Sequence, residues 1–231
     1  MIIQNNRISG LYQKLLSEYG PQGWWPLLNV SGEMIYHKNQ SSLIMSENQQ
    51  LEISLGAILT QNTNWKNATA ALQSLSANKL LSLKALNHLS QTQLADLIKP
   101  AGYYNQKAIY IKNYLELLDD FGFKKLSKLS MKDLRQKLLS IKGIGPETAD
   151  CLLLYAFQKM SFVVDAYTTR ILIKMKQISN KSSYLQIQNL FVESLESNIN
   201  VYQEYHGLLV THGKKYYQKK PYGVGDPLLQ F

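Results

Sequence analysis

The spacing of the apolar residues constrains this fold more than any other feature of the sequence. Through much of the chain they recur every three or four positions, the period of an α-helix, while the alternation typical of β-strands is scarce. We therefore expect an all-α protein. The pattern predicts two successive helical faces within 51–75, separated by the polar turn TQNTNW, and further helices over 89–98, 108–118, 131–141, 146–157, 166–175, 184–195 and 201–210.

Two regions lack this period. Residues 20–50 contain GPQGWWP and then a polar stretch, which predicts irregular structure that frames a pocket or a domain seam. The tail 212–231 is basic and then rich in Gly and Pro, which predicts a surface segment without regular structure.

Charge and cysteine content bound the partner and the compartment. Lys and Arg number 25 against 16 Asp and Glu, and the net charge of +9 suits a polyanion, although a soluble protein that is merely basic fits as well. The single cysteine, Cys151, excludes an internal disulfide framework and a multi-cysteine metal site, and its apolar surroundings predict a buried thiol. No segment has the length of a membrane span and the N-terminus lacks the apolar core of a signal peptide, so we expect an intracellular protein.

Residues 138–155, LLSIKGIGPETADCLLLY, predict a tight hairpin between two helices. Gly143 and Gly145 permit positive φ and close approach of the backbone to a ligand, and Pro146 opens the second helix where its missing N–H costs nothing. Ile144 is expected to anchor the hairpin in the core. Outward-pointing amides at the turn and at the helix start would form a phosphate site, but a bare Gly-x-Gly turn also fits an ordinary corner between two helices.

A lone carboxylate, Asp165, follows the apolar run FVV and begins the helix predicted over 166–175. In isolation, such a residue is most simply an N-cap. A catalytic carboxylate is the alternative, and the two roles are compatible.

Taken together, these segments resemble the helix-hairpin-helix DNA glycosylases of the endonuclease III superfamily. In that family the VVD element carries the catalytic aspartate, and here Asp165 follows Glu147 by 18 residues, the family's spacing from its lysine position. Ala149 matches the small residue needed for close helix packing. The resemblance implies that Asp165 is catalytic and that the hairpin binds DNA through Lys142, Gly143, Gly145 and Thr148.

A further segment, LGAILTQNTNWKNA over 55–68, resembles the family's loop that enters the DNA stack where the damaged base has left. It implies that Gln61 fills the vacated space and that Asn62 or Asn64 contacts the orphan strand; the alternative is a polar turn between helices. With the YYNQKA stretch, the resemblance covers most of 50–215.

The resemblance also implies two helical domains with a DNA-binding cleft between them. We expect a central helical barrel domain over 51–158, which contains the hairpin, and a second helical domain built from 1–50 and 159–231.

The sequence departs from the family at the position of its catalytic lysine. Bifunctional members use that amine to attack the sugar and form a Schiff base. Glu147 stands there instead and provides no amine. A one-step hydrolysis is implied, in which Asp165 stabilises the oxocarbenium charge and orients or deprotonates water. Lys142 is expected to pair with phosphate.

A second departure concerns the [4Fe–4S] cluster of many relatives, which four cysteines hold after a His-Gly-Lys/Arg motif. Residues 212–231 keep the surrounding sequence without a cysteine, so we expect no cluster, no metal and no other cofactor. Tyr217, Gly223 and Asp226 stand about where three ligands would be, and the fourth position falls at or beyond Phe231. We expect this iron–sulfur loop remnant to be held by Tyr216, Tyr217, Tyr222 and Leu228, with Lys214, Lys215, Lys219 and Lys220 facing DNA.

Within the superfamily, GWWP, ILTQNT and the glutamate after the hairpin resemble the 3-methyladenine glycosylase branch most. That resemblance implies a base pocket in which Trp24 and Trp25 sandwich a cationic alkylated purine, with Glu147 and Lys214 at its edge. Paired tryptophans beside a proline are otherwise core or seam residues, and Lys214 is equally suited to a phosphate. The polar insertion at 30–47 can redraw the pocket.

The sequence thus predicts a monofunctional DNA glycosylase that acts on a damaged base in double-stranded DNA, as a monomer, in the cytoplasm, with no membrane partner. Two alternatives stay open. One is a pyrimidine or mismatch glycosylase on the same fold, and the other is a non-catalytic helix-hairpin-helix DNA-binding protein, which would have no need of Asp165 facing phosphates.

Overall fold

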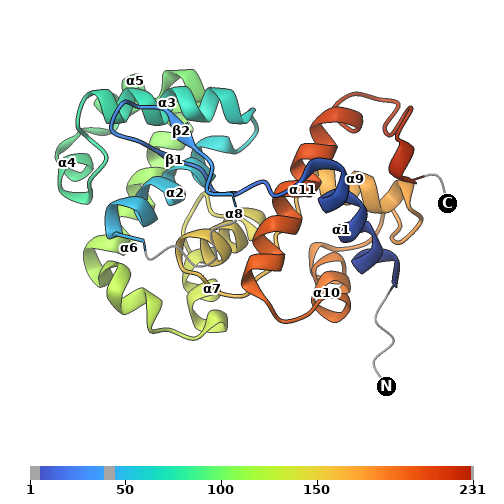
Figure 1. The fold of residues 1–231 in the computed structure, drawn as a ribbon. Coiled ribbons are helices and arrows are strands. Elements are labelled where there is room, and N and C mark those ends of the chain that lie inside the picture. Colours follow the sequence, from blue (N-terminus) through green and yellow to red (C-terminus); the bar gives the residue numbers. More distant parts are fainter. Residues whose placement is uncertain (1–5, 39–44, 230–231) are drawn as a thin grey trace. The chain divides into compact units, whose positions relative to one another are not determined.

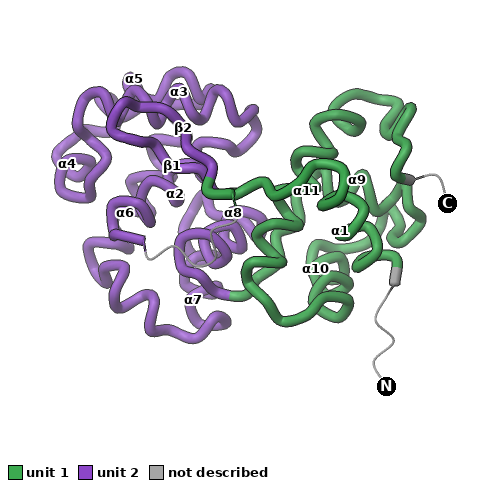
Figure 2. Tube along the Cα trace, viewed as in Figure 1, with its two compact units in different colours: residues 1–24, 37–42, 160–231 green, residues 25–36, 43–159 purple. Residues whose placement is uncertain are grey.

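The computed structural model describes residues 6–38 and 45–229, which are mostly helical (Figure 1). This confirms the predicted all-α class, to which the structure adds one very small sheet. The chain forms two compact units (Figure 2): unit 1 contains the described parts of 1–24, 37–42 and 160–231, and unit 2 those of 25–36 and 43–159. Residues 25–36 and 45–50, which we expected with the termini, lie in unit 2. In the described ranges, no helix combines the length and apolar character that crossing a membrane requires.

Unit 2 is a set of helices, several of which start at a capping side chain. Ser46 and Ser90 each form a reciprocal pair with a glutamine three residues later, and Asn64 accepts the amide of Asn67. The elements of unit 2 are β1 (Leu27–Leu28), β2 (Met34–Ile35), α2 (Glu47–Thr60), α3 (Trp65–Ala77), α4 (Leu83–His88), α5 (Gln91–Leu97), the 3₁₀ turn η1 (Lys99–Ala101), α6 (Tyr104–Ser127, kinked at Gly122), α7 (Met131–Leu139), α8 (Pro146–Cys151) and the π-helical turn η2 (Leu152–Ala156).

Helix α2 is the centre of unit 2. Every residue from Leu51 to Leu59 is buried, and the helix packs against α3, α6 and η2. Glu52 is among these buried residues, and its carboxylate accepts the backbone N–H of Leu28 at 2.6 Å, which ties strand β1 to α2. Burial raises the pKa of Glu52 to about 7, and the hydrogen bond from Leu28 opposes this shift only in part.

Unit 1 is built from α1 (Asn6–Tyr19), α9 (Ala166–Lys174), α10 (Tyr184–Ser194), α11 (Ile199–Tyr216) and the 3₁₀ turn η3 (Pro227–Leu229). An aromatic cluster fills its core: the rings of Phe162 and Phe191 stack with centroids 3.9 Å apart, and Tyr205 meets both edge-on. The Tyr205 hydroxyl donates to the carbonyl of Ile8 at 2.8 Å, so the cluster also fixes α1.

The structure corrects several predicted elements. No helix was expected at 6–19, where Gly10 and the intervening polar residues obscure the buried positions of Ile8, Leu11 and Leu15. The helix expected over 146–157 changes at Cys151, which is buried as predicted, from α to π geometry.

Outside those helices, residues 20–50 are not wholly irregular, because β1, β2 and the start of α2 lie there. Within the predicted insertion 30–47, residues 39–44 lie outside the described residues. The tail 212–231 is also not merely a surface segment: α11 continues through Tyr216, and Tyr217 and Asp226 are buried.

Replacing Glu52 by glutamine tests whether burial raises the pKa of this carboxyl group. Its pKa in the folded protein, about 7, exceeds the ordinary 4.5, so the folded state binds the proton more tightly. The resulting stabilisation is full below about pH 4.5 and is lost as the pH rises through about 7. We expect the free energy of unfolding of the wild type to fall relative to Glu52→Gln by a few kcal/mol between about pH 5 and 8, measured by urea unfolding. Glu47→Gln, on the exposed first turn of α2, is the control. If the free energy of unfolding depended on pH in the same way for the wild type and Glu52→Gln, the raised pKa of Glu52 would be contradicted.

Candidate active site

Asp165 stands where a buried extended segment, 161–164, meets helix α9. The segment is held by Gln188, whose side-chain amide donates to the carbonyl of Phe162 at 2.6 Å. Asp165 is the N-cap of α9: its Oδ1 accepts the amide N–H of Thr168 at 2.7 Å, which confirms the capping role. Among the described residues, none donates a hydrogen bond to Oδ2. The half-buried carboxylate therefore has one oxygen fixed by the helix and one available for other chemistry.

Helix α11 positions the segment that carries Trp24. The Glu204 carboxylate accepts the backbone N–H groups of Gln22 and Gly23, and the Thr211 hydroxyl donates to the side-chain carbonyl of Gln22 at 2.7 Å. Between them lies Gly207, where an added Cβ would approach the Cβ of Trp24 to 3.1 Å. Residues 22–24 thus lie directly on the backbone of α11.

Two more side chains of α11 lie within the electrostatic influence of Asp165. The Lys214 ammonium is 5.4 Å from the centroid of a Trp24 ring, and desolvation there lowers the pKa of Lys214, while the charge of Asp165 acts in the opposite direction. His206 is buried, and burial lowers its pKa against the same opposing charge of Asp165. Unit 1 therefore brings together Asp165, Trp24 and Lys214, three residues predicted from the sequence, and adds His206.

The C-terminal loop is held by a buried network of hydrogen bonds. His212 Nε2 donates to Asp226 Oδ2 at 2.8 Å, the Tyr217 hydroxyl donates to the same oxygen at 2.9 Å, and the Tyr19 hydroxyl is 2.8 Å from His212 Nδ1. Although burial opposes it, the hydrogen bonds from His212 and Tyr217 hold the pKa of Asp226 below its usual value. Two of the three positions compared with cluster ligands, Tyr217 and Asp226, thus bond to each other; at the third, Gly223, a Cβ would meet the Tyr217 hydroxyl at 2.8 Å.

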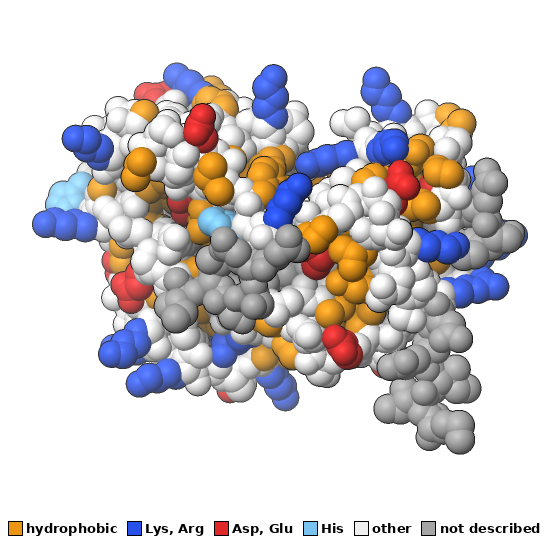
Figure 3. Space-filling view, viewed as in Figure 1, with side chains coloured by type: hydrophobic (Ala, Val, Ile, Leu, Met, Phe, Trp, Pro, Cys, Tyr) orange, Lys and Arg blue, Asp and Glu red, His pale blue; other side chains and the backbone are white. Residues whose placement is uncertain are grey.

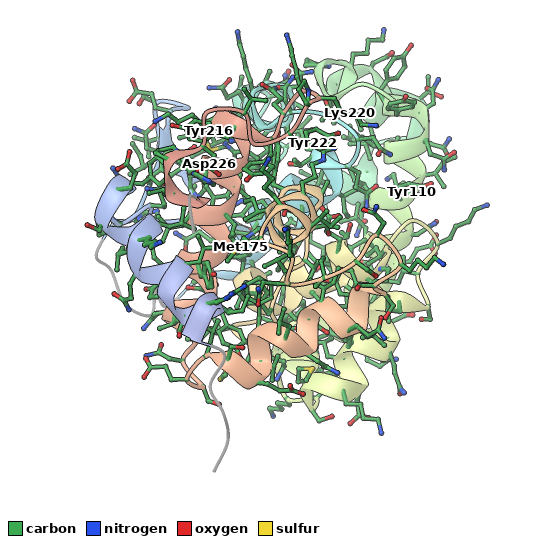
Figure 4. All side chains as sticks on the ribbon, turned by 90° about the vertical axis from the view of Figure 1, so that its right-hand side faces the viewer. Tyr110, Met175, Tyr216, Lys220, Tyr222 and Asp226 are labelled. Atoms are coloured by element: carbon green, nitrogen blue, oxygen red, sulfur yellow. The ribbon has the colours of Figure 1, made fainter. Side chains whose placement is uncertain are left out.

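Arg170 of α9 joins this loop to the helix that Asp165 caps. Its guanidinium donates to the carbonyl of Tyr217 at 2.9 Å and lies 4.5 Å from the centroid of the Tyr222 ring. Figure 4 shows Tyr216 at the end of α11, and Tyr222 and Asp226 on the loop that follows it. Lys214, Lys215, Lys219 and Lys220 are exposed, and Leu228 is half-buried.

The predicted hairpin is present in unit 2 between α7 and α8. Arg135 of α7 makes two hydrogen bonds, of 2.8 and 2.9 Å, to the fully buried carboxylate of Asp150 in α8. Ile144 is buried, as expected of an anchor. Gly143 has a φ of 102°, and a Cβ there would overlap the ring of Tyr110, so the turn requires glycine on two grounds.

Gly145 differs from Gly143 and corrects one expectation. Its φ is −88°, which any residue adopts, and nothing lies within 4 Å of an added Cβ. This glycine is therefore not required by the fold, and what it provides is open space in front of the first turn of α8.

The Gln61 loop, residues 61–64 between α2 and α3, is bonded to the hairpin. The side-chain amide of Gln61 donates to the carbonyl of Gly143 and to the hydroxyl of Thr148, each at 2.9 Å. Thr148 is buried, so in this structure its hydroxyl contacts Gln61 and is not directed to solvent. Asn62 is exposed in the left-handed region with a φ of 52°, and Asn64 caps α3.

The remaining predicted residues have distinct surroundings. Lys142 is exposed, and its carbonyl accepts the side-chain amide of Asn113 at 3.0 Å. Glu147 is exposed on the first turn of α8. Trp25 lies in unit 2 and is 8% exposed, with its ring 5.2 Å from those of Trp65 and Tyr155. Trp25 is therefore a core residue of unit 2, the alternative to a role in the base pocket. Trp24, in contrast, belongs to unit 1.

Two residues were not predicted from the sequence. His206 lies in an apolar helical pattern where a histidine is unremarkable, and only its place near Asp165 distinguishes it. Tyr103 precedes α6 in the left-handed region with a φ of 46° and is 71% exposed. A bulky residue in that conformation is strained, and strain of this kind gathers at functional sites. The local signals in the sequence are the glycine before it and its place at the start of the YYNQKA stretch.

A helix-hairpin-helix and a carboxylate that caps a following helix define a class of DNA-repair glycosylases, and comparison with known proteins agrees. The sequence model described as HhH-GPD superfamily base excision DNA repair protein matches residues 55–197. The chain belongs to this superfamily and is a DNA glycosylase of base excision repair.

Individual relatives extend the likeness over nearly the whole chain. A protein of Methanocaldococcus jannaschii, named "Putative DNA repair glycosylase", is 38% identical over 96% of this chain and 93% of its own length. The crystal structure of H. pylori 3-methyladenine DNA glycosylase bound to 1,N6-ethenoadenine has a TM-score of 0.69 at 27% identity and covers 91% of this chain and 96% of that one. An endonuclease III–DNA complex shares the fold, with a TM-score of 0.72 at 15% identity over 99% of this chain and 94% of that one.

Gly145 provides a test of the hairpin that leaves the fold intact. Because an added Cβ meets open space, Gly145→Ala is expected to keep wild-type stability and DNA affinity. Gly145→Asp adds a negative charge to the turn that we expect to contact the DNA phosphates, so affinity for any duplex should fall at least about tenfold. Fluorescence anisotropy with matched damaged and undamaged duplexes measures this. A loss confined to damaged DNA would show that the turn does not contact the backbone.

Proposed function

We propose that this glycosylase is monofunctional and hydrolyses the N-glycosidic bond of an alkylated purine. The proposal rests on a difference between the two carboxylate oxygens of Asp165. Oδ1 of Asp165 is fixed by the amide of Thr168, and no described residue donates a hydrogen bond to Oδ2. A fixed carboxylate with one oxygen that no described residue bonds suits a transition state in which positive charge develops on a sugar.

In the proposed reaction the bond between C1′ of the extruded nucleotide and the base nitrogen breaks, and the base leaves with the electron pair. Asp165 stabilises the oxocarbenium charge and accepts a proton from the water whose oxygen bonds to C1′. A base that is already cationic leaves as a neutral molecule, so it needs no general acid. An alkylated purine therefore suits a site built on a single carboxylate.

Glu147 supports a monofunctional mechanism. It occupies the position at which the superfamily's bifunctional members carry the lysine nucleophile, and a glutamate cannot form a Schiff base. Lys142 lies on the hairpin, where its exposed ammonium suits a phosphate.

Trp24 is the proposed stacking partner of the extruded base. Its electron-rich ring already lies near the Lys214 ammonium, which is the type of contact a cationic base would make. The 27% identity with a 3-methyladenine DNA glycosylase whose structure contains 1,N6-ethenoadenine supports a purine substrate. We do not extend this role to Trp25, because its ring packs in the core of unit 2.

Double-stranded DNA is proposed to bind along the hairpin and the Gln61 loop. The backbone at Gly143 and Gly145 offers close approach to phosphate. Asn62, which follows α2, and Tyr103, which precedes α6, present exposed side chains. Lys and Arg side chains are scattered over the face drawn in Figure 3, most of them toward its outline, in keeping with the net charge of +9.

We also propose that the enzyme works without an iron–sulfur cluster or other cofactor. A cluster of this kind needs four thiolates, whereas the chain has one cysteine. The network of His212, Tyr217 and Asp226 offers another way to hold the C-terminal loop.

The sharpest test replaces Asp165 by asparagine. Asparagine is also a good N-cap, so α9 should stay intact, but the charge that stabilises the oxocarbenium ion is lost. We expect single-turnover excision to fall by about two orders of magnitude or more while DNA affinity holds or rises. Asp133→Asn, which removes a carboxylate from the exposed first turn of α7, is the matched control and should excise normally.

The covalent chemistry is tested in the same assays. With the wild type, borohydride should trap no protein–DNA adduct, and strands should break only after alkali. Full activity of Asp165→Asn would contradict the role of the carboxylate. Efficient trapping would contradict the monofunctional mechanism and would direct attention to Lys214, whose ammonium lies near Asp165.

The two tryptophans are expected to behave differently when each is replaced by alanine. Trp24→Ala should weaken base binding by roughly 1–3 kcal/mol, the usual value of base–aromatic stacking, and impair excision more than binding to an abasic product. Trp25→Ala should chiefly lower the melting temperature, because it empties a buried site. Equal losses of excision and abasic-site binding in Trp24→Ala, with reduced stability, would show that Trp24 is structural too.

A further inference from the structure

Lys107 is a buried lysine that no part of the proposed chemistry uses. It lies in the first turns of α6, is 2% exposed, and donates from Nζ to the carbonyls of Leu59 and Ala101, each at 2.8 Å. Burial lowers its pKa to about 8. Burying an ammonium is costly, and a methionine of similar length would fill the same space without that cost. The amine must therefore supply something that packing alone does not.

The two acceptor carbonyls show what it supplies. Leu59 lies in the last turn of α2, two residues before Gln61, and Ala101 ends η1, two residues before Tyr103. Carbonyls at a helix end have no partner within the helix, and a cation there is favourable. One ammonium thus joins the start of the Gln61 loop to the start of the Tyr103 turn, which consists of Gly102 and Tyr103 between η1 and α6.

Both of these segments contain backbone in the left-handed region. Asn62 has a φ of 52°, and Gly102 and Tyr103 have φ values of 67° and 46°. Such conformations persist in non-glycine residues only where the surrounding structure fixes them. The two hydrogen bonds of Lys107 fix the backbone next to each of these segments.

The same helix also supports the hairpin. Tyr110 lies against Gly143, and Asn113 donates to the carbonyl of Lys142 at 3.0 Å. Figure 4 labels Tyr110 on α6. Gln61 itself also donates to the carbonyl of Gly143. The Gln61 loop, the Tyr103 turn and the hairpin are therefore all held by side chains of α6 at positions 107, 110 and 113, which are spaced three residues apart along the helix.

We propose that Lys107 is a positioning residue for base extrusion: its ammonium holds the Gln61 loop and the Tyr103 turn in the arrangement that enters the DNA stack. This inference rests on the proposed function, because extrusion precedes excision. Lys107 touches no substrate and acts through Gln61 and Tyr103.

Amide hydrogen exchange tests the positioning without any need for activity. Lys107→Met removes both hydrogen bonds while keeping the length of the side chain, and we expect exchange at 60–64 and 101–104 to accelerate about tenfold or more. Lys112→Met is the matched control: Lys112 lies on the same helix and donates to the carbonyl of Leu86 at 2.9 Å, so this variant should leave both segments unchanged. If Lys107→Met fails to fold, Lys107→Gln, whose side chain is one bond shorter and cannot hold both carbonyls as the ammonium does, replaces it. Exchange in either Lys107 variant no faster than in Lys112→Met would overturn the proposal.

A double-mutant cycle tests the link to catalysis. Single-turnover excision should fall about tenfold in Lys107→Met, but a Gln61→Ala background should reduce that loss to about twofold or less, because both changes disable the same loop. Affinity for an undamaged duplex should change less than excision. Fully additive losses would show that Lys107 acts on the fold and not through Gln61. If the wild type excises no alkylated base, the proposed function fails, and the exchange experiment still decides the positioning role.

Discussion

The candidate active site depends on how closely other segments approach helix α11. Gly207 lets the backbone at Trp24 lie on the helix, since a Cβ there would come within 3.1 Å of the Trp24 side chain. Six residues later, Gly213 does the same for α9: an added Cβ would overlap Tyr167, two residues after Asp165. The Trp24 ring and the Asp165 carboxylate are thereby both positioned by one helix, α11. Positioning of this kind is what a catalyst with few functional groups requires.

Polar groups withdrawn from water make these contacts specific. The buried Glu52 and Lys107 and the partly buried Glu204 each fix a neighbouring segment by bonding to its backbone N–H or C=O groups. Each is expensive to bury and is compensated only when the segment occupies one position. Apolar packing alone would permit small shifts of the Trp24 segment or of the Gln61 loop. The polar contacts restrict those shifts, and they do so within each unit.

The parts of the site that could be predicted from the sequence are those with local signals. The turn at Gly143 and the cap at Asp165 follow from short-range rules on φ, proline and capping, and the structure has both. Trp24 and Trp25 are adjacent in sequence, and only tertiary packing assigns Trp25 to a core. The composition of the tail suggested an irregular surface segment. The hydrogen bond between His212 and Asp226, which holds the tail, could not be predicted because it spans 14 residues and leaves no periodic pattern in the sequence. Lys107 likewise contacts Leu59 across 48 residues of sequence.

A cationic leaving base makes a covalent intermediate unnecessary, and this couples the proposed substrate to the proposed mechanism. The most direct measurement incubates the wild-type enzyme with duplexes that each contain one lesion, identifies the released base by mass spectrometry, and compares strand breaks before and after alkali. We expect release of alkylated, positively charged purines, with breaks only after alkali, and release of uncharged lesions slower by about a hundredfold or more. Preferential release of an uncharged base, or breaks that precede alkali, would contradict the account.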